Sequence, residues 1–192
     1  MEETKYCLCC NEEVPLSTVT RNGRIEVTCL YCGFTLDVKK MYEAREPAEK
    51  GHALIADDSK YTRKIIEELL KEKEYSENVQ SFENGLMLIS AYSKLLNEKQ
   101  PVDIAIVDLN MPVMDGLTTA RTIRSLEAQN SSRAVPIIFF SAEKADDNLK
   151  KQMETIGHAS YMNKGADPDP DSLAARVEML ISYLREKYSK AT

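Results

Sequence analysis

Two sets of side chains in this sequence could do chemistry: cysteines near the start of the chain and carboxylates further along it. All five cysteines lie within the first 32 residues. Four of them form two pairs, each with two residues between its members, and 18 residues separate the pairs. These are Cys7, Cys10, Cys29 and Cys32. Paired thiolates at this spacing are typical of zinc sites, and four of them fill the coordination sphere, so the pattern predicts a structural Zn²⁺ rather than a catalytic one.

The residues around the cysteines indicate how the pairs could be brought together. Apolar and polar residues alternate on either side of Asn22 and Gly23, a dipeptide that favours a β-hairpin, and a third strand is expected over residues 34–38. Asn11 and Gly33 directly follow a cysteine pair, where a left-handed backbone directs amides toward sulfur. This order of elements resembles the zinc-ribbon family over residues 5–39.

Two questions about the cysteines stay open at the level of sequence. The alternative to a metal site is a small sheet with reduced, buried cysteines, although a module of this size buries little apolar area and usually needs a metal or disulfides to fold. Cys9 is the fifth cysteine, and it is either an unliganded thiol or a ligand in place of Cys10. The closer spacing of Cys7 and Cys9 disfavours the second option.

The carboxylates follow short apolar runs that read as buried strands. Asp57 and Asp58 come after residues 53–56, and Asp108 comes after residues 102–107. If these strands are parallel neighbours, their ends lie about 5 Å apart. Two carboxylates at 4 Å repel each other by roughly 1–4 kcal/mol near a protein surface. A hard divalent cation with oxygen ligands, Mg²⁺ above all, relieves this repulsion.

Two further polar residues follow later apolar runs. Ser141 ends one of them, and Lys164 follows the last. A nucleophilic carboxylate, a divalent cation, a hydroxyl and an ammonium together suit phosphoryl transfer onto Asp108, because each of the last three can neutralise one phosphoryl oxygen.

The chain after Gly51 alternates between strand and helix patterns. Strands are expected over residues 53–56, 78–82, 102–107, 135–140 and 159–162. Helices are expected over residues 59–70, 86–96, 115–128, 148–156 and 173–184. Five such units in a row imply an α/β fold, with a parallel sheet covered by helices on both faces.

The acidic pair, the segment from Asp108 through Met111-Pro112 to Asp115-Gly116, the pair Ser141-Ala142 and the final Lys164 occur in a characteristic order. This set resembles the receiver domain of two-component response regulators, over residues 51–188. The resemblance implies a flavodoxin-like (βα)5 doubly wound sheet with strand order 2-1-3-4-5. The expected division is therefore a zinc ribbon at residues 1–40, a linker at 41–50 and a receiver domain at 51–192.

The resemblance also implies roles for individual residues. Asp108 would accept a phosphoryl group from a histidine kinase or phosphotransfer protein, and would bind Mg²⁺ together with Asp58 and the backbone carbonyl of Asn110. Asp57 would act on Mg²⁺ mainly through water. Three residues would respond to the phosphoryl group and alter the surface formed by the fourth helix, fifth strand and fifth helix: Lys164, Ser141 and Tyr161. Asn110 and Glu143 stand at the positions that tune dephosphorylation.

One position departs from the family pattern. Receivers usually have a proline after this lysine, often with a cis peptide bond, whereas here Gly165 follows Lys164. A cis bond before a residue other than proline costs about 2.5–4 kcal/mol. We therefore expect a trans loop that relies on glycine flexibility.

The sequence leaves several alternatives to a signalling receiver with an output of its own. One is a phosphate sink or relay intermediate without output, and another is an aspartyl-phosphate phosphatase. The enzyme is disfavoured, because such hydrolases commonly carry a second acid where this chain has Asn110. A scaffold that has lost the phosphorylation site is also disfavoured, since the acids, hydroxyl and lysine are all present.

Composition limits the partners. The net charge is −6, from 25 basic and 31 acidic residues, which disfavours nucleic acid and favours protein partners. No apolar run approaches the roughly 20 residues of a membrane span, and no signal peptide is evident, so a cytoplasmic protein is expected. Because the chain ends near the last predicted helix, output is expected from the receiver surface, the ribbon or both, and the sequence leaves homodimerisation open.

Overall fold

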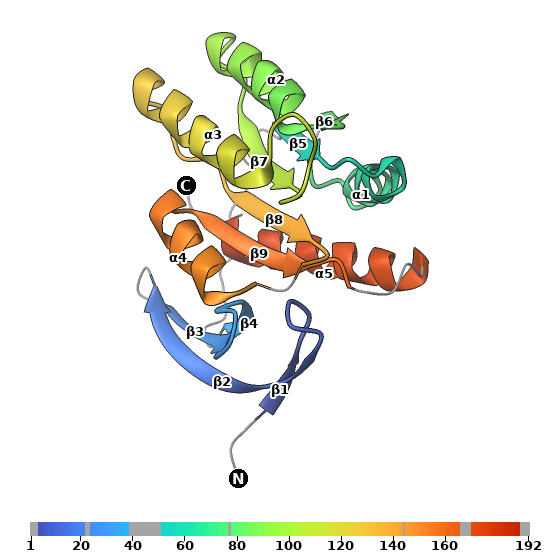
Figure 1. Cartoon of the computed structure of the whole chain (residues 1–192), viewed down its shortest axis with the longest axis vertical. Helices are drawn as coiled ribbons and strands as arrows, with labels where there is room; N and C mark the ends of the chain where they lie inside the picture. The colour runs from blue at the N-terminus through green and yellow to red at the C-terminus, as the bar shows by residue number, and fades with distance from the viewer. Residues whose placement is uncertain are drawn as a thin grey trace.

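The computed structural model describes residues 4–21, 24–38, 51–76, 78–143, 145–165 and 170–188. Within these residues the strands are β1 (Thr4–Cys7), β2 (Glu12–Arg21), β3 (Arg24–Cys29), β4 (Thr35–Val38), β5 (His52–Ala56), β6 (Asn78–Phe82), β7 (Val102–Val107), β8 (Ile137–Ser141) and β9 (Ala159–Asn163). The helices are α1 (Lys60–Glu72), α2 (Gly85–Asn97), α3 (Gly116–Asn130), α4 (Asp147–Ile156) and α5 (Pro170–Tyr188). They form a small four-stranded sheet followed by a larger α/β unit (Figure 1).

The larger unit is a parallel sheet with the order β6-β5-β7-β8-β9. Counted within this unit the order is 2-1-3-4-5, which confirms the doubly wound, flavodoxin-like fold. Helices α1 and α5 pack together, and α2, α3 and α4 follow one another on the other side of the sheet (Figure 1). No helix in the described part of the chain is both long and apolar enough to cross a bilayer.

Side-chain caps start helices α1 to α4. In each, a polar side chain accepts a hydrogen bond from the backbone amide three residues further on, which satisfies a donor that the helix leaves free. The caps are Ser59 for α1, Asn84 for α2, Asp115 for α3 and Asp146 for α4. Because each of these helices begins shortly after a strand, the caps lie near the edge of the sheet where the strands end.

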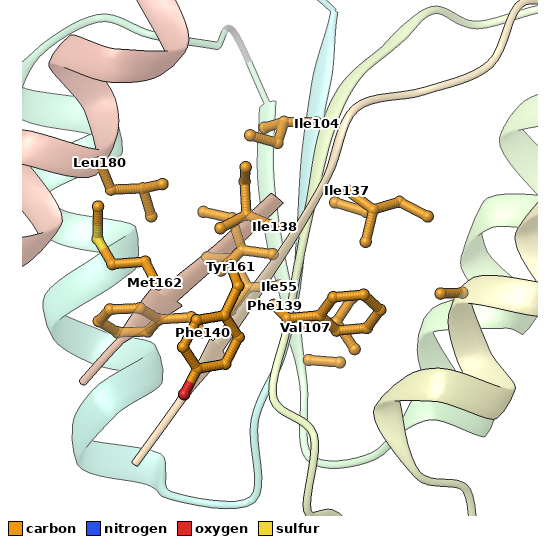
Figure 2. Packing of buried hydrophobic residues seen from close by; sticks show 14 of the residues in the cluster. Ile55, Ile104, Val107, Ile137, Ile138, Phe139, Phe140, Tyr161, Met162 and Leu180 are labelled. Atoms are coloured by element: carbon orange, nitrogen blue, oxygen red, sulfur yellow. The ribbon is translucent and has the colours of Figure 1, made fainter. Parts of the chain in front are cut away.

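The core of the larger unit is the sheet itself, whose central strands are apolar on both faces. Phe139 and Phe140 of β8 are both fully buried. Figure 2 shows their rings on opposite sides of the sheet, as the alternation of side chains along a strand requires. The continuous apolar run predicted for this strand is therefore explained by burial on both faces.

The smaller sheet is antiparallel, with the order β1-β2-β3-β4. The predicted hairpin is β2 and β3, and the predicted third strand is β4. Strand β1 was not expected from the sequence, because three of its four residues are exposed and it lacks an alternating pattern. The turn residues Asn22 and Gly23 and the linker predicted at residues 41–50 lie outside the described residues.

The loop after β7 contains a residue in an unfavourable backbone conformation. Val113 has a φ of 69°, and its side chain is 78% exposed. A left-handed backbone costs an L-residue about 1–2 kcal/mol, and branching at Cβ makes this worse. The exposed valine side chain has little packing to offset this cost, so the loop beside Asp108 is held in a strained state by its surroundings.

We expect Val113→Asn to raise the free energy of unfolding by about 1 kcal/mol, because asparagine tolerates the left-handed region. Urea unfolding monitored by circular dichroism measures this change. Val113→Thr is the matched control, since it keeps the branched Cβ and should give no gain. An equal effect of both substitutions would contradict this account of the strain.

Candidate functional site

An ion-paired lysine joins the ends of two adjacent strands. Asp57 follows β5 and Asp108 follows β7, and these strands are parallel neighbours. Lys164, which follows β9, places its Nζ 2.7 Å from Oδ2 of Asp57 and 2.5 Å from Oδ2 of Asp108. All three side chains are largely buried. Residues more than 50 positions apart in the chain thus meet at one edge of the sheet, as the sequence predicted.

Asp58 completes the group from the solvent side. One carboxylate oxygen each from Asp57, Asp58 and Asp108 lies within 4.8 Å of the others, with Asp58 exposed. Three carboxylates and one ammonium leave a formal charge of −2 at this point (three times −1, plus 1). Oxygen donors with excess negative charge fit a hard divalent cation. The amide of Asn110 donates to Oδ1 of Asp108 at 3.4 Å, so its backbone also lies beside the group.

Burial disfavours the ionised form of Asp57. Removal from water raises the pKa of this carboxyl to about 6, and Asp108 adds to the rise, while the ion pair and hydrogen bond with Lys164 oppose it. The ionised form of Asp57 is therefore less stable in the fold than in water, even with an ammonium beside it. A bound cation would offset this deficit.

The predicted switch residues Ser141 and Tyr161 lie together on β8 and β9. Ser141 is buried at the end of β8, and the hydroxyl of Tyr161 donates to its backbone carbonyl at 3.3 Å. Tyr161 is 3% exposed, and its ring lies beside the buried core (Figure 2). Asn110 and Glu143 are exposed in the loops after β7 and β8, and Asn110 lies beside Asp108.

Asn163 is a residue whose part the sequence reasoning missed. Its side-chain amide donates to the carbonyls of Ala142 and Glu143 at 3.3 and 2.7 Å, and its Oδ1 accepts from the amide of Gly165 at 2.6 Å. It therefore ties the loop after Ser141 to the loop that carries Lys164. Its position between Tyr161 and Lys164, at the end of a buried strand, is the only signal that the sequence offered.

The loop at Gly165, where the sequence departs from the family pattern, has the trans geometry that we expected. The described residues contain no cis peptide bond, and Gly165 has a φ of 89°. Lys164 reaches both carboxylates from this trans loop. Glycine is needed here because the conformation is one that residues with a Cβ rarely adopt.

The four predicted cysteine ligands form a second cluster. Their sulfurs all lie within 4.8 Å of one another, with Cys7 and Cys32 3.5 Å apart and Cys10 and Cys29 3.7 Å apart. A tetrahedral zinc ion with bonds of about 2.3 Å would separate its sulfurs by about 3.8 Å. The thiols therefore stand at distances that fit this metal without rearrangement.

Backbone geometry supports the same arrangement. The amides of Tyr31 and Cys32 both donate to the sulfur of Cys29 at 3.3 Å. Asn11 and Gly33 have φ values of 62° and 71°, which confirms the left-handed conformation predicted after each cysteine pair.

Cys9 is not one of these four clustered sulfurs, although its thiol lies within hydrogen-bonding reach of Cys7 and Cys32. It is 1% exposed, and its thiol donates to the backbone carbonyl of Tyr161 at 2.6 Å. The cluster contains Cys10, which favours Cys10 over Cys9 as a ligand. Cys9 instead contacts the larger unit, a contact that the sequence gave no means to predict.

Residues 53–178 match the family model of the response regulator receiver domain. The chain belongs to this family. Among curated proteins, it is 30% identical over 118 residues to hybrid signal transduction histidine kinase A of Dictyostelium discoideum, covering 62% of this chain. It is 28% identical over 144 residues to a protein-glutamate methylesterase/protein-glutamine glutaminase of Clostridium acetobutylicum, covering 75% of this chain. The matches span only 5% and 39% of these relatives.

Solved receiver structures have the same fold. The receiver domain of the histidine kinase CKI1 from Arabidopsis thaliana, complexed with Mg²⁺ and BeF₃⁻, has a TM-score of 0.60 at 24% identity and covers 73% of this chain and 91% of its own. CheY of Borrelia burgdorferi, in a complex with CheX, BeF₃⁻ and Mg²⁺, has a TM-score of 0.54 at 23% identity, with 71% and 87% covered. The matched family segment begins after the cysteine module, to which the family assignment does not extend.

The raised pKa of Asp57 predicts a pH-dependent gain in stability for Asp57→Asn. Because the folded pKa is higher than the unfolded one, the penalty for the ionised carboxyl is fully present above pH 6 and is lost as the pH falls toward 4. Without Mg²⁺, we expect Asp57→Asn to stabilise the protein at pH 7.5 by on the order of 1–2 kcal/mol, and by less at pH 5.

Urea unfolding at the two pH values, in the presence of a chelator weak enough to leave thiolate-bound metal in place, measures this effect. The exposed carboxylate of Asp58 provides the control, since Asp58→Asn should give a smaller gain with less dependence on pH. A loss of stability in Asp57→Asn at pH 7.5 would show that the ion pair with Lys164 outweighs the cost of burial.

Proposed function

We propose that this protein is a phosphoacceptor of two-component signalling, with Asp108 as the residue that is modified. The observation that carries the proposal is the meeting of Asp57, Asp58, Asp108 and Lys164 at one edge of the sheet. These four side chains come from three strand ends, and a purely structural role would not require three carboxylates at one point.

The arrangement supports a balanced transfer reaction. A carboxylate oxygen of Asp108 attacks phosphorus, the bond between phosphorus and the donor nitrogen of a phosphohistidine breaks, and the released imidazole takes up a proton. Lys164, now paired with Oδ2 of Asp108, would move its pairing to the phosphoryl group. The hydroxyl of Ser141 would donate to a second phosphoryl oxygen, and Tyr161 lies directly against Ser141.

The residues fit Mg²⁺ by charge and by donor type. Asp58, Asp108 and the backbone carbonyl of Asn110 would hold it, with Asp57 acting mainly through water. When bound, the cation would neutralise charge on the phosphoryl group and on the carboxylates. Structures of two similar receivers are described with Mg²⁺ and BeF₃⁻, which supports the same chemistry here.

The proposed phosphodonor is a histidine kinase or phosphotransfer protein, and the proposed location is the cytoplasm. A change in the surface of α4, β9 and α5 would carry the signal to a protein partner. Asn110 and Glu143, both exposed, would set the rate of dephosphorylation. The alternative of a phosphate sink without output uses the same site and differs only in having no partner that responds.

We expect acetyl phosphate and Mg²⁺ to add one phosphoryl group per chain, and Asp108→Asn to abolish this addition. The acceptor carboxylate is then replaced by an amide that cannot attack phosphorus. Intact-mass spectrometry measures the added mass, and Asp103→Asn is a control carboxylate on the same strand. Phosphorylation of Asp108→Asn to the wild-type level would contradict the assignment.

We further propose that the four-cysteine module binds one structural Zn²⁺ through Cys7, Cys10, Cys29 and Cys32. The sulfur spacing and the amides directed at Cys29 support this set. With four protein ligands the ion would have no open position, so it would hold β1 to β4 together rather than take part in catalysis.

The zinc assignment predicts about one zinc per purified chain, measured by inductively coupled plasma mass spectrometry. Cys29→Ser should reduce the bound zinc strongly, because it removes the ligand that two amides support. Cys9→Ser is the matched control and should retain zinc. Loss of zinc in Cys9→Ser alone would indicate that the fifth cysteine is a ligand.

A further inference from the structure

The cysteine module is docked against one edge of the receiver sheet. The module lies beside β9 and α5 (Figure 1), and the thiol of Cys9 donates to the carbonyl of Tyr161 at 2.6 Å. The rings of Phe34 and Tyr183 are 4.9 Å apart between centroids, and both side chains are buried. The module and the receiver therefore share a buried apolar contact as well as polar ones.

Arg176 of α5 links the two units next to the carboxylate site. Its Nη1 donates to the carbonyl of Leu8 at 2.9 Å and to the carbonyl of Asn163 at 3.2 Å, and its Nη2 donates to Oδ1 of Asn11. Two of these acceptors belong to the module. The third belongs to the residue that directly precedes Lys164.

The same guanidinium explains the glycine that follows Lys164. A Cβ added to Gly165 would lie 2.9 Å from Nε and 3.0 Å from Cζ of Arg176. A proline ring or any larger side chain would push the guanidinium away from its acceptors. Arg176 thus occupies the space next to the loop that carries Lys164.

We propose that Arg176 is a positioning residue for phosphoryl transfer, and that the cysteine module holds it in place. The inference rests on the proposed role of Lys164 toward the phosphoryl group. Glycine leaves the loop with the greatest backbone freedom, so the Lys164 loop needs an outside restraint. Arg176 supplies one through the carbonyl of Asn163, and its own position is fixed by Leu8 and Asn11.

If Arg176 positions the Lys164 loop, its loss should change the rate of phosphorylation, whereas a residue that only holds the two units together should leave that rate unchanged. Arg176 contacts none of the three carboxylates in the contacts described above, so its loss should leave Mg²⁺ affinity intact. A shift of a reacting group by about 1 Å can cost up to about 100-fold in rate. We therefore expect Arg176→Ala to lower the rate of phosphorylation at saturating acetyl phosphate by about tenfold, with a change of less than about twofold in the Mg²⁺ dissociation constant.

The experiment uses the full zinc-loaded chain, with Mg²⁺ affinity from calorimetry and rates from intact-mass spectrometry. Arg176→Lys should recover part of the rate, because an ammonium can still donate to a backbone carbonyl. Arg121→Ala is the matched control, since this exposed arginine bonds to the side chain of Gln152 on the α3–α4 side. Thermal unfolding and zinc content establish that each variant is folded.

Asn11→Gly tests the part played by the module. Glycine accepts the left-handed backbone at this position, so the backbone is kept while the side-chain oxygen that accepts from both Arg176 and the Tyr6 hydroxyl is removed. We expect a smaller fall in rate than for Arg176→Ala, and no further fall when both substitutions are combined, because they break the same link. This variant also serves if Arg176→Ala does not fold.

The outcomes separate the inference from the proposed function. If the unmodified chain takes up no phosphoryl group on Asp108, the proposed function fails and the inference with it. If the unmodified chain is phosphorylated and Arg176→Ala matches its rate, the inference alone is overturned. Equal losses of Mg²⁺ affinity and rate, or additive effects of Asn11→Gly and Arg176→Ala, would also overturn it.

Discussion

The structure depends on one ammonium group placed between two carboxylates. Lys164 holds the ends of β5 and β7 together by pairing with Asp57 and Asp108, and it does so from the loop after β9, the last strand of the sheet. Without that cation, the acids at this edge would repel one another in a partly buried setting where water screens them poorly. The excess negative charge that remains is what makes the edge suited to a divalent cation.

The fold makes this interaction possible by placing the ends of β5, β7 and β9 at the same edge of the sheet. Parallel pairing places the residues after β5 and β7 side by side, and the crossover order leaves a crevice where ligands gather in sheets of this kind. Close packing also fixes the backbone of Asp108, since a Cβ on Gly116 would lie 2.2 Å from the backbone oxygen of Asp108. Asn163 then ties the lysine loop to the neighbouring strand end.

Much of this could be predicted from the sequence, because strong local patterns determine it. Strands β6 and β7 have the predicted bounds, the cysteine spacing indicated the four sulfurs that cluster, and the acids after apolar runs indicated the three carboxylates that meet. The strand order followed from family resemblance rather than from any pattern. What could not be predicted depends on contacts between distant residues: the roles of Asn163 and Arg176, the contact of Cys9 with Tyr161, and the exposed strand β1.

The docking of the cysteine module also covers part of β9, which is the last strand of its sheet. An edge strand carries backbone groups that can pair with another chain, and proteins commonly protect such edges with side chains or a covering segment. Here the thiol of Cys9 donates a hydrogen bond to the carbonyl of Tyr161, and the ring of Phe34 packs against the ring of Tyr183 on the adjoining helix α5. Any protein that binds this face, including a second copy of the chain, must therefore either displace the cysteine module or recognise a surface formed by the module and the receiver together.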